Sequence, residues 1–308
     1  MFCSSCKSPA IIYLPYSKTH LCEKHFKEMF DKRIRATIRE FAMIKRNERI
    51  AVGLSGGKDS CVLLYSLARL RETLPFEIIA ITIDEGIEGY RNKTLEFAKA
   101  ECKKLGIEHH TFSYKKEVGL SLDEIMKKKG EEEIPCSYCG VMRRRLLNNA
   151  ARELNADKLA LGHNLDDIAQ TVLMNIMRNE PQRLARLNEP LVEDEKFVPR
   201  IRPLMRTPEK EVAVYALTSG IEIDFQECPY ARHAFRAHVR EQLNETEEKY
   251  TGTKFKIVNS FFAMEKALRK GLAEDGEKLE MKYCKQCKEP SANEICVFCG
   301  MIEKLQTV

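Results

Sequence analysis

Short, continuous apolar runs alternate with stretches of helical spacing through the middle of the chain. The runs at residues 49–54, 77–84, 109–114 and 158–162 predict four buried strands, and residues 221–225 are a candidate for a fifth. Apolar positions three or four residues apart predict helices at 26–45, 91–105, 141–154, 165–177, 234–249 and 257–270. This alternation predicts an α/β fold built on a doubly wound parallel sheet.

Three polar or glycine-containing segments follow the predicted strands directly. Gly53, Asp84 and Gly162-His163 each stand where a strand ends. Ligands of such sheets bind beyond the carboxyl ends of the strands, so we expect these segments to share one crevice. We expect a small module at residues 1–30, a core at 31–272 that includes a helical part, and a second module at 273–308, with a polar linker near 273–278.

The segment Gly53-Leu54-Ser55-Gly56-Gly57-Lys58-Asp59-Ser60 lies between a predicted strand and a predicted helix. Free backbone N–H groups and the positive end of the helix dipole make such a turn an anion site, and glycines allow close approach to phosphate. The segment is not an ordinary P-loop. Only three residues separate Gly53 from Gly57, and Asp59 stands where that motif needs a hydroxyl for magnesium.

Composition places the 308-residue chain among globular proteins, with 44% hydrophobic and 31% charged residues. No window approaches the ~18 apolar residues of a membrane span, and residues 1–6 lack the features of a secretory signal, so we expect a cytoplasmic protein. The net charge is +5. Basic residues concentrate at 18–49 and between Arg178 and Arg206, which suits a polyanion such as RNA, although charge alone also fits a solvated surface.

Twelve cysteines in such a protein indicate metal sites rather than disulfides. Two sets have the spacing of closed four-ligand zinc sites, which leave no open position for chemistry. The first set is Cys3, Cys6, Cys22 and His25, with His20 as the alternative to His25, and the second is Cys284, Cys287, Cys296 and Cys299.

A third set contains Cys136, Cys139 and the distant Cys228. Three thiolates are one short of a closed zinc site. Their spacing fits a zinc ion with an open position, a redox disulfide or an iron–sulfur cluster with one iron not held by protein, and it does not choose among the three.

Two further segments carry candidate chemistry. Asn164, Asp166 and Asp167 open a predicted helix at the end of a strand, and Asn164 or Asp166 can cap that helix. A carboxylate here can instead act on magnesium or substrate, and we expect Asp167 rather than Asp166 to be the catalytic one. Arg143, Arg144 and Arg145 follow Cys139 on a helix and point in different directions, so at most two can reach the crevice. Arg143, one turn beyond Cys139, is expected nearest to it.

Taken together, these motifs resemble the tRNA 2-thiouridine synthetase family (TtuA and archaeal NcsA type) of PP-loop ATP pyrophosphatases. The resemblance rests on Ser55–Ser60, the three cysteine sets and Gly162-His163-Asn164-x-Asp166-Asp167, and it covers nearly the whole chain. It implies a PP-loop core of the adenine nucleotide α-hydrolase-like class, flanked by two zinc modules. It also implies a homodimer.

The resemblance further implies a reaction and its site residues. ATP would bind with its phosphates on the loop and its adenine nearby, on the residues Gly53, Ser55, Gly56, Gly57, Lys58, Asp59, Ser60, Ile83, Asp84 and Gly162. With magnesium present, the C2 oxygen of a tRNA uridine would be adenylated and then replaced by sulfur. A [4Fe-4S] cluster would be held by Cys136, Cys139 and Cys228. Asp59, Asp167 and Arg143 map onto catalytic positions, with Arg143 also beside the cluster. Some family members have Lys in place of Arg143, and an arginine does not readily give up its proton.

Two other functions fit part of the pattern. A PP-loop amidotransferase or ligase that uses ammonia would leave the three cysteines unexplained, and nothing in the chain resembles a glutaminase. A non-catalytic zinc protein that binds RNA would leave the loop at Gly53 unexplained. The sequence does not indicate which uridine is modified. It also does not identify the sulfur donor, which can be a ubiquitin-like thiocarboxylate carrier, a persulfide or sulfide.

Overall fold

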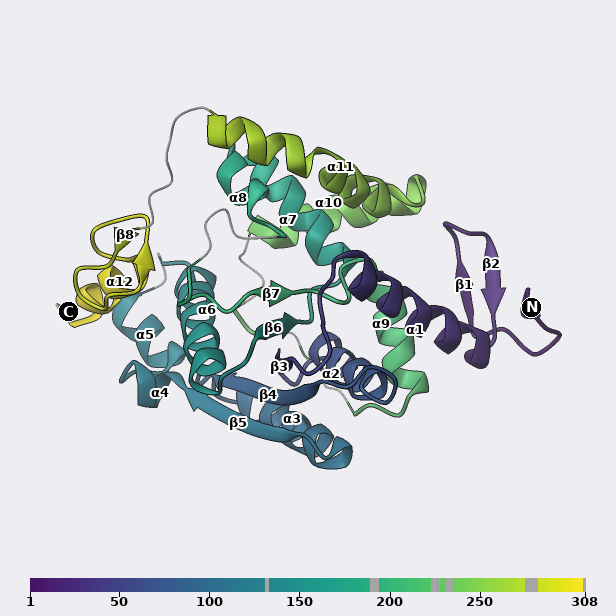
Figure 1. Ribbon diagram of the computed structural model, residues 1–308, viewed down its shortest axis with the longest axis horizontal. Helices are drawn as coiled ribbons and strands as arrows, with labels where there is room; N and C mark the ends of the chain where they lie inside the picture. Colours follow the sequence, from purple (N-terminus) through teal and green to yellow (C-terminus); the bar gives the residue numbers. More distant parts are fainter. Residues whose placement is uncertain are drawn as a thin grey trace.

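The computed structural model describes residues 1–130, 133–188, 194–222, 226, 228–230, 235–274 and 282–306. A parallel sheet forms the centre, with helices on both faces, and the two terminal modules lie at opposite ends of the molecule (Figure 1). This is the α/β architecture expected from the sequence.

The sheet has the strand order β5-β4-β3-β6-β7, and every neighbouring pair is parallel. Its strands are β3 (Arg49–Gly53), β4 (Glu77–Asp84), β5 (Glu108–Ser113), β6 (Lys158–Leu161) and β7 (Arg200–Ile201). The chain runs outward from β3 to β5 on one side and continues through β6 and β7 on the other. The order therefore reverses between β3 and β6, and the switch point lies where Gly53 pairs with Leu161.

The fifth strand is not where the sequence suggested. Ile221 and Glu222 lie outside any strand, and residues 223–225 lie outside the described residues. The place is taken by β7, which has only two residues and therefore no hydrophobic periodicity that a sequence pattern could reveal.

Alternation along the buried strands divides the core between the two faces. Val52 and Ala80 contribute to one cluster with α2 (Lys58–Leu70), while Ala51 and Ile79 contribute to another with α6 (Pro135–Glu153). The remaining core helices are α1 (Glu23–Glu40), α3 (Arg91–Leu105), α4 (Tyr114–Glu117), α5 (Leu122–Lys129), α7 (Leu165–Met177), α8 (Pro181–Ala185), α9 (Glu209–Thr218), α10 (Phe235–Lys249) and α11 (Thr253–Glu274). The last two form a layer with α7 and α8 above the sheet edge (Figure 1).

Several helix limits differ from the sequence pattern. Helix α6 begins at Pro135, six residues earlier than expected, because proline is suited to the first helical turn; Cys136 and Cys139 therefore lie within this helix. Helix α1 ends at Glu40 rather than residue 45, just before Ala42 adopts a positive φ of 46°.

The terminal modules are small. The hairpin of β1 (Ile12–Leu14) and β2 (Thr19–Leu21) precedes α1, which continues from this module into the core without a break. At the other end, β8 (Lys282–Tyr283) and β9 (Pro290–Ser291) form a hairpin, and α12 (Val297–Gln306) packs against α5 and α6. Among the described residues, no helix has both the length and the apolar character to cross a bilayer.

Gly56 offers a test of the packing that fixes the nucleotide loop. Its φ is +82°, and a Cβ atom there would stand 1.9 Å from the backbone oxygen of Thr94 in α3. The substitution Gly56→Ala should lower the free energy of unfolding by about 1–2 kcal/mol for the left-handed backbone and a further ~1–3 kcal/mol for the clash. Chemical denaturation monitored by circular dichroism measures both.

Gly89→Ala is the matched control, since Gly89 has a φ of +72° but no atom within 4 Å of the added Cβ. It should show only the backbone cost. Equal destabilisation by the two variants would mean that the loop is free to move away from α3.

Candidate functional site

The loop between β3 and α2 is held in shape by its own serines. Ser55 N and Ser55 Oγ lie 3.1 and 3.0 Å from Ser60 Oγ, which in turn donates to the Gly57 carbonyl at 2.9 Å. Gly57 caps α2 without a side-chain hydrogen bond. The first N–H groups of this helix are therefore left for an anion, as the sequence predicted for a phosphate site.

Gly162 allows the end of β6 to lie directly against the start of α2. A Cβ atom at Gly162 would come within 3.0 Å of the Asp59 carbonyl carbon and the Ser60 nitrogen. Only glycine allows this approach without displacing the backbone. Of the other expected nucleotide contacts, Ile83 is buried, and Asp84 uses its carboxylate to accept the Gly86 N–H at 2.9 Å.

Lys58 is surrounded by carboxylates. Its Nζ lies 3.0 Å from Asp59 Oδ2 and 2.7 Å from Glu209 Oε1, at the start of α9. Burial acts to lower the pKa of Lys58, but Asp59 and Glu209 outweigh it and raise the pKa, so the ammonium stays charged. The loop and the start of α9 therefore bring the Lys58 ammonium and the carboxylates of Asp59 and Glu209 together.

Asp166 and Asp167 have different surroundings, although they are adjacent in α7. Asp166 is buried, accepts the Glu209 N–H at 2.8 Å and forms an ion pair with Lys254 of α11. Its two oxygens are therefore occupied in joining α7, α9 and α11, which is a structural role.

Asp167 closes a capping box with Asn164, whose side-chain amide also donates to Asp59 Oδ1 at 2.9 Å. The Asp167 side chain is 31% exposed and lies 3.9 Å from the Arg236 guanidinium. Burial and the nearby Asp59 carboxylate raise the pKa of Asp167 to about 6. A carboxylate with this pKa can accept and release a proton near neutral pH.

Cys136, Cys139 and Cys228 share one environment. Burial raises the pKa of both Cys136 and Cys228, and in each case the nearby Cys139 side chain raises it further. All three are free thiols, and Cys136 Sγ lies 3.7 Å from the Tyr230 carbonyl oxygen. Within the described part of the chain, they are not among the sets whose ligand atoms all lie within 4.8 Å of one another, as donors to a single ion must.

Arg143 is the basic side chain at this cysteine group. Its Nη2 donates to Cys139 Sγ at 3.0 Å, and its Nε lies 2.8 Å from Glu85 Oε1. The second oxygen of Glu85 lies 2.9 Å from Arg91 Nε. Arg91 Nη1 donates to the Ser55 carbonyl at 2.6 Å, so polar contacts run unbroken from the nucleotide loop to Cys139.

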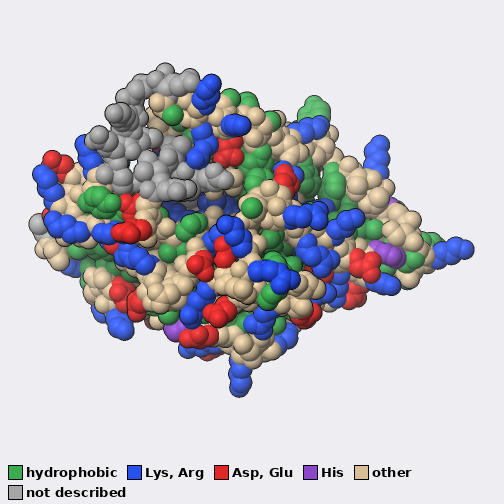
Figure 2. Space-filling model, viewed as in Figure 1, with side chains coloured by type: hydrophobic (Ala, Val, Ile, Leu, Met, Phe, Trp, Pro, Cys, Tyr) green, Lys and Arg blue, Asp and Glu red, His purple; other side chains and the backbone are tan. Residues whose placement is uncertain are grey.

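The neighbouring arginines and His163 have separate roles. Arg145 points to the C-terminal module, 3.3 Å from Glu289, and not into the crevice. Desolvation by the crevice walls, with Arg202 and Arg236 nearby, lowers the pKa of His163 to about 3, so this imidazole is neutral. Lys and Arg side chains also gather on the face shown in Figure 2 over α1, which carries much of the basic segment 18–49.

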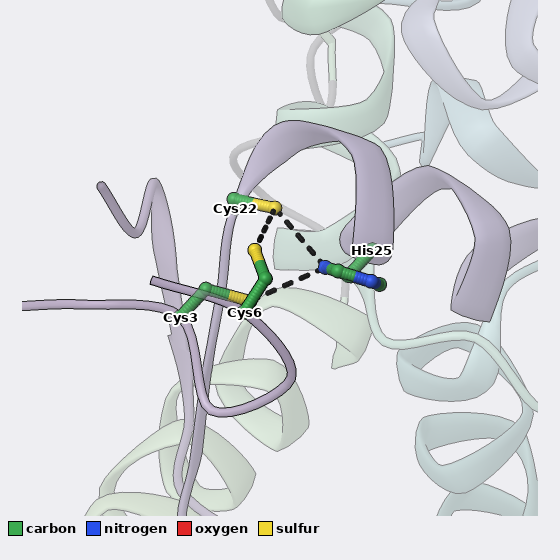
Figure 3. A group of neighbouring side chains, drawn as sticks. All are labelled: Cys3, Cys6, Cys22 and His25. Carbon is green, nitrogen blue, oxygen red and sulfur yellow. Dashed lines mark hydrogen bonds between the residues drawn. The ribbon is translucent and has the colours of Figure 1, made fainter. Parts of the chain in front are cut away.

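The N-terminal set brings Cys3, Cys6, Cys22 and His25 together, with all ligand atoms within 4.8 Å of one another. His25 Nδ1 lies 3.4 Å from Cys3 Sγ and 3.3 Å from Cys22 Sγ (Figure 3). His20, the alternative ligand, instead stacks on Tyr13. Although burial acts against it, hydrogen bonds from backbone N–H groups lower the pKa of Cys3 to about 6, which favours the thiolate that a metal needs.

The C-terminal set is equally compact and consists of Cys284, Cys287, Cys296 and Cys299. The backbone N–H groups of Cys296 and Cys299 donate to cysteine sulfurs at 3.2 and 3.3 Å. Glu289 of this module pairs with Arg152 of α6 at 2.7 Å. This module is therefore fastened to the helix that carries Cys136 and Cys139.

Sequence reasoning missed three residues of this site, namely Glu85, Arg91 and Glu209, whereas it had offered Asn164 as a cap of α7, as the structure confirms. The only signal for Glu85 was its place next to Asp84 at a strand end. The others depend on tertiary contacts between elements far apart in the sequence, such as Glu209 with Lys58.

Comparison with known proteins identifies the family of the chain. Residues 23–247 match the model of a family described as "PP-loop domain", and residues 3–27 match "2-thiouridine synthetase TtuA, N-terminal LIM domain". The chain is 38% identical to a tRNA-5-methyluridine(54) 2-sulfurtransferase of Pyrococcus horikoshii, over 97% of this chain and 93% of that protein. It is 36% identical to the tRNA 2-thiolation protein NcsA of Haloferax volcanii, over the full length of both.

A solved structure has the same architecture. The U34-tRNA thiolase NcsA of Methanococcus maripaludis, determined with its [4Fe-4S] cluster, superposes with a TM-score of 0.84 at 35% identity, covering 99% of this chain and 96% of that one. The chain therefore belongs to the tRNA 2-thiouridine synthetase family, of the TtuA and archaeal NcsA type, within the PP-loop ATP pyrophosphatases.

Proposed function

We propose that this protein is an ATP-dependent tRNA uridine 2-sulfurtransferase. The observation that carries the proposal is the chain of contacts from the nucleotide loop to Cys139 through Arg91, Glu85 and Arg143. These contacts connect the backbone of the loop, where we propose an anion site, to the group of three free thiols through Cys139. The proposal of tRNA as the substrate is supported by relatives that are named as tRNA thiolation proteins.

The loop would hold the ATP phosphates on the backbone N–H groups at the start of α2, with Lys58 as a charge partner. The adenine would lie by Gly53, Ile83 and Gly162. Magnesium would offset the charge that develops on the departing pyrophosphate, and Asp59 is placed beside Lys58 to act in this step.

Adenylation forms a bond between the uridine O2 and the α-phosphorus and breaks the bond from that phosphorus to the pyrophosphate oxygen. The uridine N3 proton must leave as O2 attacks, and we assign its acceptance to Asp167. The carboxylate is partly exposed and has a pKa of about 6, which suits a base near neutral pH. When sulfur replaces the O2 atom, AMP leaves with that oxygen.

The three cysteines fit an iron–sulfur cluster better than the two other interpretations. They form no disulfide, and they do not share the short mutual spacing of ligands to one ion. When bound, a [4Fe-4S] cluster supplies an iron that no protein ligand occupies, where sulfur can be held. Arg143 keeps its proton, because Glu85 and Cys139 outweigh the effect of burial and raise its pKa, so its role is to balance thiolate charge.

The remaining assignments follow the family. We propose zinc in both four-ligand sets, an N-terminal module at 1–30, a PP-loop core at 31–272 and a zinc module at 273–308. We also propose a homodimer that receives sulfur from a ubiquitin-like thiocarboxylate carrier or from sulfide. A cytoplasmic location is supported by relatives such as the Cytoplasmic tRNA 2-thiolation protein 1 of Arabidopsis thaliana, 34% identical over 96% of this chain.

The direct test is mass spectrometry of nucleosides from tRNA treated anaerobically with the cluster-loaded protein, ATP and sulfide. We expect 2-thiouridine or its 5-methyl derivative, formed only when ATP is present. Product containing nitrogen in place of sulfur when ammonia is supplied would instead indicate an amidotransferase, and unmodified tRNA that is nevertheless bound would indicate a non-catalytic RNA-binding protein.

Cys136→Ala should abolish thiolation and lower the iron content, because two thiolates cannot hold the cluster in place of three. ATP-analogue binding should persist, because the residues of the loop are intact, with the affinity of the cluster-free wild-type protein. Cys102→Ala, which removes a buried cysteine of α3 far from the group, is the control and should retain both iron and activity. Full thiolation by Cys136→Ala would contradict the cluster assignment.

The raised pKa of Asp167 predicts that the rate of thiolation depends on pH. Because the carboxylate is ionised only above about pH 6, kcat/KM for thiolation should rise between pH 5 and 7, and Asp167→Asn should lose about 10²–10⁴-fold in rate together with this pH dependence.

The raised pKa of Asp167 also affects stability, because between about pH 4 and 6 the folded state holds a proton that the unfolded state has lost. Asp167 therefore destabilises the fold as pH rises from about 4 to 6, and thermal unfolding of Asp167→Asn should lack this trend.

The substitution Asp166→Asn distinguishes the role of Asp166 from that of Asp167. It should lower the unfolding temperature, since it breaks the buried pair with Lys254, but leave the apparent pKa of kcat/KM near 6. The assignment of the base is wrong if Asp166→Asn shifts the pH profile and Asp167→Asn does not.

A further inference from the structure

Glu85 is a buried carboxylate that the expected chemistry does not use. It directly follows Asp84, the last residue of β4, and its side chain is 4% exposed. One oxygen faces Arg91 at 2.9 Å and the other faces Arg143 at 2.8 Å. A buried charge of this kind persists only when it is paired, so the three side chains must be arranged together.

Each arginine connects Glu85 to a different functional element. Arg91 donates to the backbone carbonyls of Ser55 in the nucleotide loop and Ile83 in β4, and to Thr94 Oγ1. Arg143, on α6, donates to Cys139 Sγ. Glu85 therefore joins the two arginines that connect the backbone of the phosphate loop to Cys139 of the cysteine group.

We propose that Glu85 is a positioning residue that couples occupancy of the nucleotide loop to binding of the iron–sulfur cluster at Cys139. The inference rests on the proposed function, because it takes ATP and the cluster as the two ligands. A phosphate bound on the loop fixes the Ser55 carbonyl, which fixes Arg91; Glu85 then holds Arg143 against Cys139. When one ligand is bound, the side chains that both ligands need are already ordered. The second ligand therefore binds more tightly, and binding of the two is cooperative.

Linkage gives this coupling a measurable form. If the cluster tightens binding of a non-hydrolysable ATP analogue by some factor, the analogue must stabilise the cluster by the same factor. The dissociation constant of the analogue is measured by calorimetry on cluster-free and cluster-loaded protein. Loss of iron to a chelator, with and without the analogue, gives an independent readout.

In the wild-type protein we expect a coupling of about 5-fold or more in the analogue affinity, within the usual range for coupled sites. Glu85→Gln keeps the size of the side chain but removes its charge, and it should reduce the factor to near 1. Arg91→Lys is a second variant that retains the charge but cannot reach Glu85 and two carbonyls at once, and it should have the same effect.

Glu88→Gln is the matched control, the same substitution three residues further on at an exposed position. It should keep the wild-type coupling. Zinc content and unfolding temperature are compared across the variants. A purely structural role would lower the unfolding temperature of Glu85→Gln and leave the coupling factor unchanged, and that result overturns the proposal.

Two different results would refute the role of Glu85 alone or the proposed function as well. A wild-type protein that holds a cluster and thiolates tRNA, but shows no coupling, refutes only the role of Glu85. A wild-type protein that binds no cluster refutes both.

Discussion

The close approach of β6 to the start of α2 is the constraint on which the site depends. Because Gly162 has no side chain, the strand end lies against Asp59 and Ser60. This contact puts the switch point of the sheet, the phosphate loop and the capping box of α7 at one place, where Asn164 reaches Asp59. A bulkier residue at position 162 would push the phosphate loop away from the end of β6, and Asp59 would no longer lie close to Asn164 and Asp167.

Much of the architecture could be predicted from the sequence because it is encoded locally. Four strands of the sheet and helices such as 91–105 and 165–177 follow from apolar periodicity, and the two four-ligand sets follow from cysteine spacing. The sequence did not reveal β7, since two residues carry no period, nor Glu85, whose importance arises only when Arg91 and Arg143 converge on it from separate helices.

Adjacent residues of the same type can serve opposite purposes. One helical step separates Asp166 from Asp167, yet that step turns the first toward α9 and α11 and the second toward the crevice. Sequence reasoning could propose a preference between them but no physical basis for it. The basis lies in their partners: Lys254 holds Asp166 in place through an ion pair, while burial and the nearby Asp59 carboxylate raise the pKa of Asp167.

The attachment of the C-terminal module to α6 links its four-cysteine set to the group that contains Cys136 and Cys139. Glu289 pairs with Arg145 and Arg152, which lie on the helix that also carries Cys136 and Cys139. Loss of the fold of this module would remove the two ion pairs that brace the helix, and with them a constraint on the positions of Cys136 and Cys139. Under the proposed metal assignments, sulfur transfer to RNA would then depend on the C-terminal ion although that ion takes no part in the reaction.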